Sequence, residues 1–155
     1  MKVIFLDYDG VMNPPNTCLV FHTPRNADFG REAVDNLNYI LEKTGAYIVV
    51  SATNRGNDSW TVKLFDYNGI DSARYIDYTS SLRDRPRGDE IKQWLTAESI
   101  RTGGSEPESF VIIDDESDMG ELNDHLVKTN YMIGLTRTDA EKAIKILNGG
   151  TETHD

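Results

Sequence analysis

Short apolar runs alternate with stretches of helical period along the chain, and this alternation limits the folds that it can adopt. Runs with the β-branched and aromatic content of strands lie at residues 2–8, 46–51, 73–78, 110–113 and 125–129. Apolar residues at helical spacing lie at residues 31–44, 59–67, 87–99 and 138–147. Strands that alternate with helices form right-handed βαβ units, and helices cover both faces of their parallel sheet. We therefore expect one α/β domain, a three-layer, doubly wound, Rossmann-like sheet of five parallel strands.

The expected helices have recognisable ends. Gly45 follows the first as a stop signal, and Thr138 and Glu141 have the spacing of a capping box at the start of the last. The chain of 155 residues is long enough for one domain with a sizeable core. We assign residues 1–148 to that domain and expect residues 149–155 to form a flexible tail.

Polar side chains follow three of the expected strands. Asp7 and Asp9 come after the first, Ser51 ends the second, and Asp114 and Asp115 end the fourth. Taken singly, these residues also fit turns and helix caps. In a parallel sheet, however, the carboxyl ends of the strands share one edge, and ligands bind at that edge. We therefore expect one site that collects these side chains.

Part of the negative charge of the chain is concentrated at these strand ends. Lys and Arg number 16 and Asp and Glu number 26, so the net charge is 16 − 26 = −10. This balance argues against a broad basic surface for nucleic acid, but not against action on a single phosphate. Crowded carboxylates stay ionised when a cation joins them, and hard oxygen ligands favour Mg²⁺. The acids concerned are Asp7, Asp9, Asp114, Asp115, Glu116 and Asp118.

These motifs resemble those of the haloacid dehalogenase (HAD) superfamily of phosphotransferases. The first motif is matched by residues 3–11, the second by Ser51 after an apolar strand, the third by Arg87 at the start of a helix, and the fourth by the acids from Asp114 onward. The likeness runs from residue 2 to about residue 147. The segments RGDEIKQWL, VIIDDESDM and HLVKTN resemble the small HAD domains of RNA-repair proteins and the phosphatase domain of phage polynucleotide kinase–phosphatases.

The resemblance implies a role for each catalytic residue. Asp7 would attack phosphorus and form an aspartyl phosphate, and Asp9 would act as general acid and base. Ser51 would donate a hydrogen bond to the phosphoryl group, and Arg87 would neutralise it. Arg85 and Lys92 remain alternatives to Arg87, because the family more often has a lysine at this position.

The resemblance also implies a Mg²⁺ site and a set of substrate contacts. Asp7, the main-chain carbonyl of Asp9, and Asp114 would bind the metal, and spacing leaves open whether Asp115 or Asp118 joins them. The candidates for substrate binding are Gly10, Asn13, Arg25, Arg55 and Lys92. Asn13 could equally be a turn residue, and Arg55 could equally be solvated or paired with a nearby acid.

The spacing of the motifs leaves no room for a folded cap domain, either in residues 10–50 or in residues 52–86. An open site would admit a polymer end, or a neighbouring subunit could close it over a small molecule. We expect residues 14–28, which include Arg25, to determine specificity. A local basic rim could form from Arg25, Arg55, Arg83, Arg85 and Arg87.

The sequence thus predicts a phosphomonoester hydrolase for a nucleotide or a polynucleotide end. The alternatives are a capless oligomeric phosphatase for sugar phosphates, a phosphoacceptor receiver, and a binding module without catalysis. The chain has a single cysteine and no long apolar run, so we expect a cytoplasmic protein, monomeric or a small homo-oligomer, that does not bind membranes.

Overall fold

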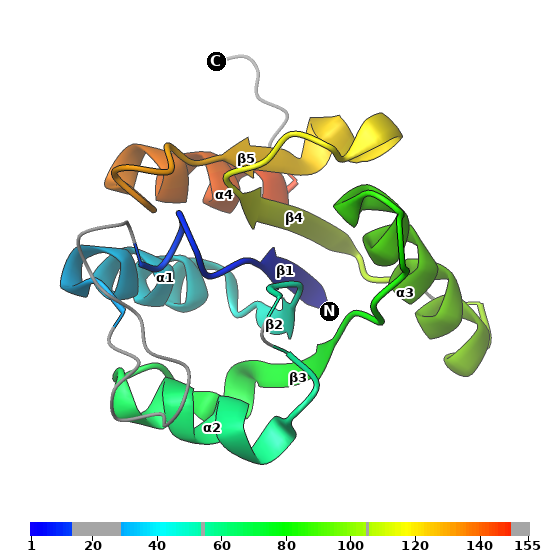
Figure 1. Cartoon of the computed structure of the whole chain (residues 1–155), viewed down its shortest axis with the longest axis horizontal. Coiled ribbons are helices and arrows are strands. Elements are labelled where there is room, and N and C mark those ends of the chain that lie inside the picture. Colours follow the sequence, from blue (N-terminus) through cyan, green and yellow to red (C-terminus); the bar gives the residue numbers. More distant parts are fainter. Residues whose placement is uncertain (14–28, 54, 105, 150–155) are drawn as a thin grey trace.

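Five parallel strands form a single sheet in the computed structural model, which describes residues 1–13, 29–53, 55–104 and 106–149 (Figure 1). The strand order is β3-β2-β1-β4-β5. This confirms the predicted fold class, and no large cap domain is present in the described part of the chain. The strands are β1 (Lys2–Leu6), β2 (Tyr47–Val50), β3 (Tyr75–Tyr78), β4 (Ser109–Asp114) and β5 (Leu126–Lys128).

Helices cover both faces of the sheet, as Figure 1 shows for α1 and α3 on opposite sides. The helices are α1 (Arg31–Thr44), α2 (Asp58–Tyr67), α3 (Arg87–Arg101) and α4 (Arg137–Leu147), with short 3-10 segments η2 (Ser72–Arg74) and η3 (Gly120–His125). The buried side chains of α1, α2 and α4 form one core, whereas those of α3 form a second core on the other face.

The central strand β1 explains why the sequence shows a continuous apolar run rather than an alternating one. Ile4 and Leu6 pack into the core beneath α1 and α4, while Val3 and Phe5 pack into the core beneath α3. Both faces of a doubly covered parallel sheet are apolar, so every residue of the strand must be apolar.

The direction of winding reverses between β1 and β4. From β1 the chain passes through α1 and α2 to β2 and β3, and α3 then returns it on the opposite face to β4, the other neighbour of β1. Such a reversal leaves a crevice at the carboxyl ends of the two strands, where open α/β sheets bind ligands. Asp7 follows β1 and Asp114 ends β4, so the predicted acids lie at this point.

The predicted capping box of the last helix was wrong by two residues. The box is formed by Thr136 and Asp139, which exchange hydrogen bonds of 3.1 Å between side chain and backbone, not by Thr138 and Glu141. The sequence offers both pairs at the right spacing. Contacts of Arg137 favour the earlier one, because its Nε donates to Asn36 at 3.0 Å from the first turn of α4.

No helix among the described residues is both long enough and apolar enough to span a membrane.

Candidate active site

Backbone pairing at the ends of the strands brings the predicted motifs to one edge of the sheet. The amide of Asp7 donates to the Ile113 carbonyl at 3.1 Å, and the amide of Ser51 donates to the Leu6 carbonyl at 2.9 Å. Parallel pairing therefore continues one residue beyond β1 and β2. The side chains of Asp7, Ser51 and Asp114 are held close to each other by the sheet itself.

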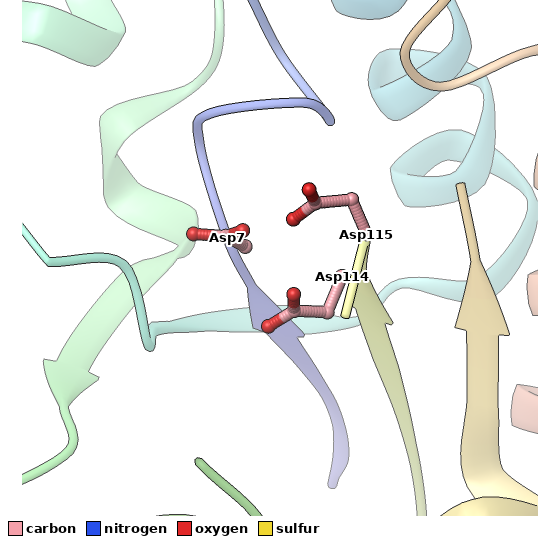
Figure 2. Close-up of side chains that lie close together, drawn as sticks. All are labelled: Asp7, Asp114 and Asp115. Carbon is pink, nitrogen blue, oxygen red and sulfur yellow. The ribbon is translucent and has the colours of Figure 1, made fainter. Parts of the chain in front are cut away.

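Three carboxylates converge at this edge, as Figure 2 shows for Asp7, Asp114 and Asp115. One oxygen of each lies within 4.8 Å of the others. Burial, reinforced by the neighbouring Asp114, raises the pKa of Asp7 to about 8, and burial raises the pKa of Asp114 to about 6. The negative charges of these neighbouring carboxylates repel one another, and a bound divalent cation would offset that repulsion. Mg²⁺ prefers oxygen ligands of this kind, so the donor set fits this metal.

Arg87 is the cation that the structure places against these carboxylates. Its Nη1 lies 2.9 Å from Asp114 Oδ2 and 3.4 Å from Asp7 Oδ1. Burial opposes its charge, but the carboxylates of Asp114 and Asp7 together raise its pKa. The two predicted alternatives pair elsewhere: Arg85 lies 3.2 Å from Asp89, and Lys92 pairs with Glu121 at the surface.

The start of α3 is fixed so that Arg87 reaches the site. Asp118 accepts a hydrogen bond of 3.1 Å from the Arg87 amide, and the Gly88 amide donates to the Asp118 carbonyl at 3.2 Å. A Cβ atom at Gly88 would lie 2.6 Å from the Met119 carbonyl oxygen, so only glycine permits this approach. Within the described residues the acidic cluster holds Asp115 and not Asp118, which instead orients α3.

Two hydrogen bonds hold the loop that follows Asp7, one within the loop and one from Thr129 after β5. Asp9, the predicted general acid, is exposed, and Asn13 Nδ2 orients it by donating to Asp9 Oδ1 at 2.9 Å. Thr129 Oγ1 donates to the Gly10 carbonyl at 2.8 Å. Gly10 has a φ of +79°, and a Cβ there would lie 2.8 Å from Asp115 Cγ. The structure gives Gly10 and Asn13 these packing contacts, and their binding of substrate stays a prediction.

Ser51 is fully buried, and its Oγ has no hydrogen-bond partner within residues 1–13, 29–53, 55–104 and 106–149. A buried hydroxyl without a partner costs free energy, so such groups commonly serve function. Its predicted donation to a phosphoryl group remains a prediction that this arrangement favours.

Arg55 is held by the protein on three sides. Its Nε donates to the Thr79 carbonyl at 2.6 Å, its Nη1 donates to the Ala52 carbonyl at 2.6 Å, and its Nη2 lies 3.1 Å from Glu90 Oε1. Sequence reasoning missed Glu90, which is buried in α3 one turn after Arg87. Its signal would have been a carboxylate on the apolar side of a helix that also carries Ile91 and Trp94.

A cleft of about 430 Å³ opens beside Arg87 and was not predicted. Its walls come from the end of β3, from the segments that follow β2, β3 and β4, and from the first turn of α3. Of the predicted rim, Arg55, Arg85 and Arg87 line this cleft. Arg25 and the predicted specificity segment, residues 14–28, lie outside the described residues.

A second unpredicted feature is an exposed apolar turn in the segment that follows β5. Tyr131, Met132 and Ile133 are exposed by 51%, 68% and 60%, and a Cβ at Gly10 would lie 2.7 Å from the Tyr131 ring.

Comparison with known families places the chain beside an RNA-repair family. The family model for the HAD domain in Swiss Army Knife RNA repair proteins matches residues 3–140. Neither the curated proteins nor the solved structures give a match.

Proposed function

The chain belongs to the family of HAD domains found in Swiss Army Knife RNA repair proteins, and on this premise we propose that it is a Mg²⁺-dependent phosphatase of nucleotides or polynucleotide ends. The observation that carries the proposal is the meeting of Asp7, Asp114 and Asp115 with Arg87 at the point where the winding of the sheet reverses. A buried acidic cluster with one guanidinium suits a phosphoryl group that arrives with a metal.

Asp7, Asp114 and Asp115 would hold the metal, with the main-chain carbonyl of Asp9 as the further ligand that the sequence predicts. When bound, Mg²⁺ would supply positive charge that offsets the repulsion between these carboxylates and the phosphate. Because the pKa of Asp7 is raised to about 8 in the protein alone, positive charge beside it also favours the ionised, nucleophilic form.

The first chemical step is transfer of the phosphoryl group to the protein. One carboxylate oxygen of Asp7 forms a bond to phosphorus while the bond from phosphorus to the leaving oxygen breaks. Asp9, oriented by Asn13, gives its proton to that oxygen, so the product leaves as an alcohol. Arg87 and the free hydroxyl of Ser51 stabilise the charge on the phosphoryl oxygens.

The second step regenerates the carboxylate. Asp9, now ionised, removes a proton from a water molecule whose oxygen attacks the phosphorus of the aspartyl phosphate. The bond from phosphorus to Asp7 then breaks and inorganic phosphate leaves. Asp9 thus regains the proton that it gave to the leaving oxygen in the first step.

Turnover of a substrate panel tests the proposal. The panel holds a 3′-phosphorylated oligoribonucleotide, nucleoside monophosphates and sugar phosphates, each with Mg²⁺ and with EDTA, for the wild type and Asp7→Asn. We expect phosphate release that needs Mg²⁺, is greatest on nucleotides or oligonucleotides, and is lost in Asp7→Asn but kept in Asp66→Asn, an exposed aspartate of α2. Turnover that survives Asp7→Asn would contradict the mechanism, and a preference for sugar phosphates would contradict the substrate class.

A further inference from the structure

The cleft adjoins the candidate active site at Arg87, and apart from Arg87 its lining has no part in the chemistry above. Arg87 lines the cleft and also lies 3.4 Å from Asp7 Oδ1. A group attached to a phosphate at Asp7 could therefore extend into the cleft. Its volume of about 430 Å³ falls in the range of pockets for small ligands, about 300 to 1,000 Å³.

The walls of the cleft are set in place by Arg55 and Glu90. Arg55 binds the carbonyls of Ala52 and Thr79, which belong to the two segments that form one side. Glu90 accepts hydrogen bonds from Arg55 and from the Leu82 amide, at 3.1 Å and 3.0 Å. This pair joins the segments after β2 and β3 to α3, so the cleft is preformed. Preformed walls lose little entropy on binding.

The charges in the cleft are balanced, which argues against a second anionic group as its occupant. Arg55 is paired with Glu90, and Arg87 with Asp7 and Asp114. Arg85 lies 3.2 Å from Asp89. The acids Glu116 and Asp118 also line the cleft. A polar but uncharged ligand fits this balance better than a phosphate does.

Hydroxyl groups dominate the remaining lining. Thr53, Tyr78, Thr79, Ser80 and Ser81 all contribute to it. Ser80 and Ser81 are exposed, and the structure gives their side chains no hydrogen bond to any described residue. Thr79 is fully buried, and its Oγ1 has no partner in the described part of the chain. The cleft therefore offers uncommitted donors and acceptors, the chemistry that recognises a sugar with adjacent hydroxyls.

We propose that this cleft binds the ribose of the substrate nucleotide and that Ser80 and Ser81 distinguish ribose from 2′-deoxyribose. The inference rests on the proposed function and names its substrate class more narrowly. The 2′-hydroxyl is the group by which a protein separates RNA from DNA at a given site. A chain with a net charge of −10 needs such local contacts to select an RNA end.

The test uses adenosine monophosphates that carry the phosphate at the 3′ or the 5′ position. They are compared with their 2′-deoxy counterparts and with ribose 5-phosphate. We expect the kcat/KM of the wild type to favour the ribonucleotide by about fivefold, the effect of one or two hydrogen bonds. Ser80→Ala/Ser81→Ala should bring the ratio close to one. Ser59→Ala, which removes an exposed hydroxyl of α2 outside the cleft, should leave both the ratio and the rates unchanged.

The preference for ribose is also measured without turnover, as the ratio of the affinities of the two nucleotides from calorimetric titration into Asp7→Asn. A ribose preference in binding that disappears with Ser80→Ala/Ser81→Ala supports the proposal even if no substrate is hydrolysed, in which case the proposed function alone fails. Equal affinity for ribose and deoxyribose forms, or a preference that survives the double substitution, would overturn it. Ribose 5-phosphate that binds as tightly as the nucleotide would also overturn the proposal, because the cleft would then recognise a sugar phosphate and not a nucleotide.

Discussion

Asp7 is buried and lies beside the carboxylate of Asp114, and both features raise its pKa. Its pKa is raised from 3.8 to about 8, whereas in the unfolded chain it titrates near its ordinary value. Between these two values the folded protein holds a proton that the unfolded chain releases. The free energy of unfolding therefore falls as pH rises through this window. Asp114, with a pKa of about 6, adds to the fall in the free energy of unfolding over the lower part of this pH window.

The pH dependence of stability tests whether Asp7 titrates in this way. In EDTA, we expect the free energy of unfolding of the wild type, from urea titrations, to fall between about pH 5 and about pH 8. Asp7→Asn removes the titrating group, so its curve should be flatter and it should be the more stable protein at the upper end. Parallel curves for the two proteins would show that Asp7 does not titrate in this way.

Arg87 is expected to contribute through its charge at the phosphoryl group. Arg87→Ala should lower kcat/KM by about 10²- to 10³-fold, the usual effect of losing one stabilising group of this kind. Arg87→Lys should recover part of that loss, because it restores the charge without the fork of donors. Lys92→Ala should cost much less, because Lys92 pairs with Glu121 at the surface. Equal losses in Arg87→Ala and Lys92→Ala, measured by steady-state kinetics, would reject this assignment.

At the scale of the elements, a buried ion pair joins α3 to the segments after β2 and β3. The side chains of Arg55 and Glu90 are each 9% exposed, and both are also bonded to backbone groups. Removal of one partner leaves the other charge buried and unpaired.

Glu90→Ala should therefore reduce the free energy of unfolding by about 3 kcal/mol. Asp89→Asn, one residue earlier, removes a more exposed partner of Arg85 and should cost less than about 1 kcal/mol. Urea titrations of the two variants give the comparison. Similar costs for both would mean that the buried pair does not hold these elements together.

The elements that sequence reasoning predicted are those whose signals are local. Asp7 and Asp114 follow buried strands directly, and parallel pairing alone brings such strand ends together. The capping box was misplaced because Arg137 contacts Asn36, which is far away in the sequence. Glu90 and the cleft depend on partners in three separate segments, and no periodicity reports such contacts. The choice among Arg85, Arg87 and Lys92 likewise needed the position of α3 on the sheet.

At the scale of the whole molecule, the net charge of −10 and the acidic cluster lead us to expect that stability depends on divalent cations. A ligand that binds only the folded state stabilises it, by about 2.7 kcal/mol at a concentration 100 times its Kd. We expect Mg²⁺ to raise the Tm at constant ionic strength.

The residues of the cluster should control that effect. Asp115→Asn should abolish most of the Mg²⁺-dependent rise in Tm, whereas Asp118→Asn should keep more of it, because Asp118 binds the Arg87 amide and lies outside the cluster. Asp66→Asn, an exposed acid of α2, serves as the control for general charge effects. An equal rise in all three variants would mean that Mg²⁺ acts by screening and not at this site.

In the proposed mechanism, Asp7 carries the phosphoryl group during catalysis. The most direct measurement is mass spectrometry of peptides from acid-quenched single turnovers of an aryl phosphate. Its good leaving group needs little help from Asp9, so Asp9→Asn should form the aspartyl phosphate and hydrolyse it slowly. We predict a phosphoryl group on Asp7 in this variant, and none in Asp7→Asn. Consumption of the substrate with no phosphoryl group on Asp7 at any quench time would contradict it.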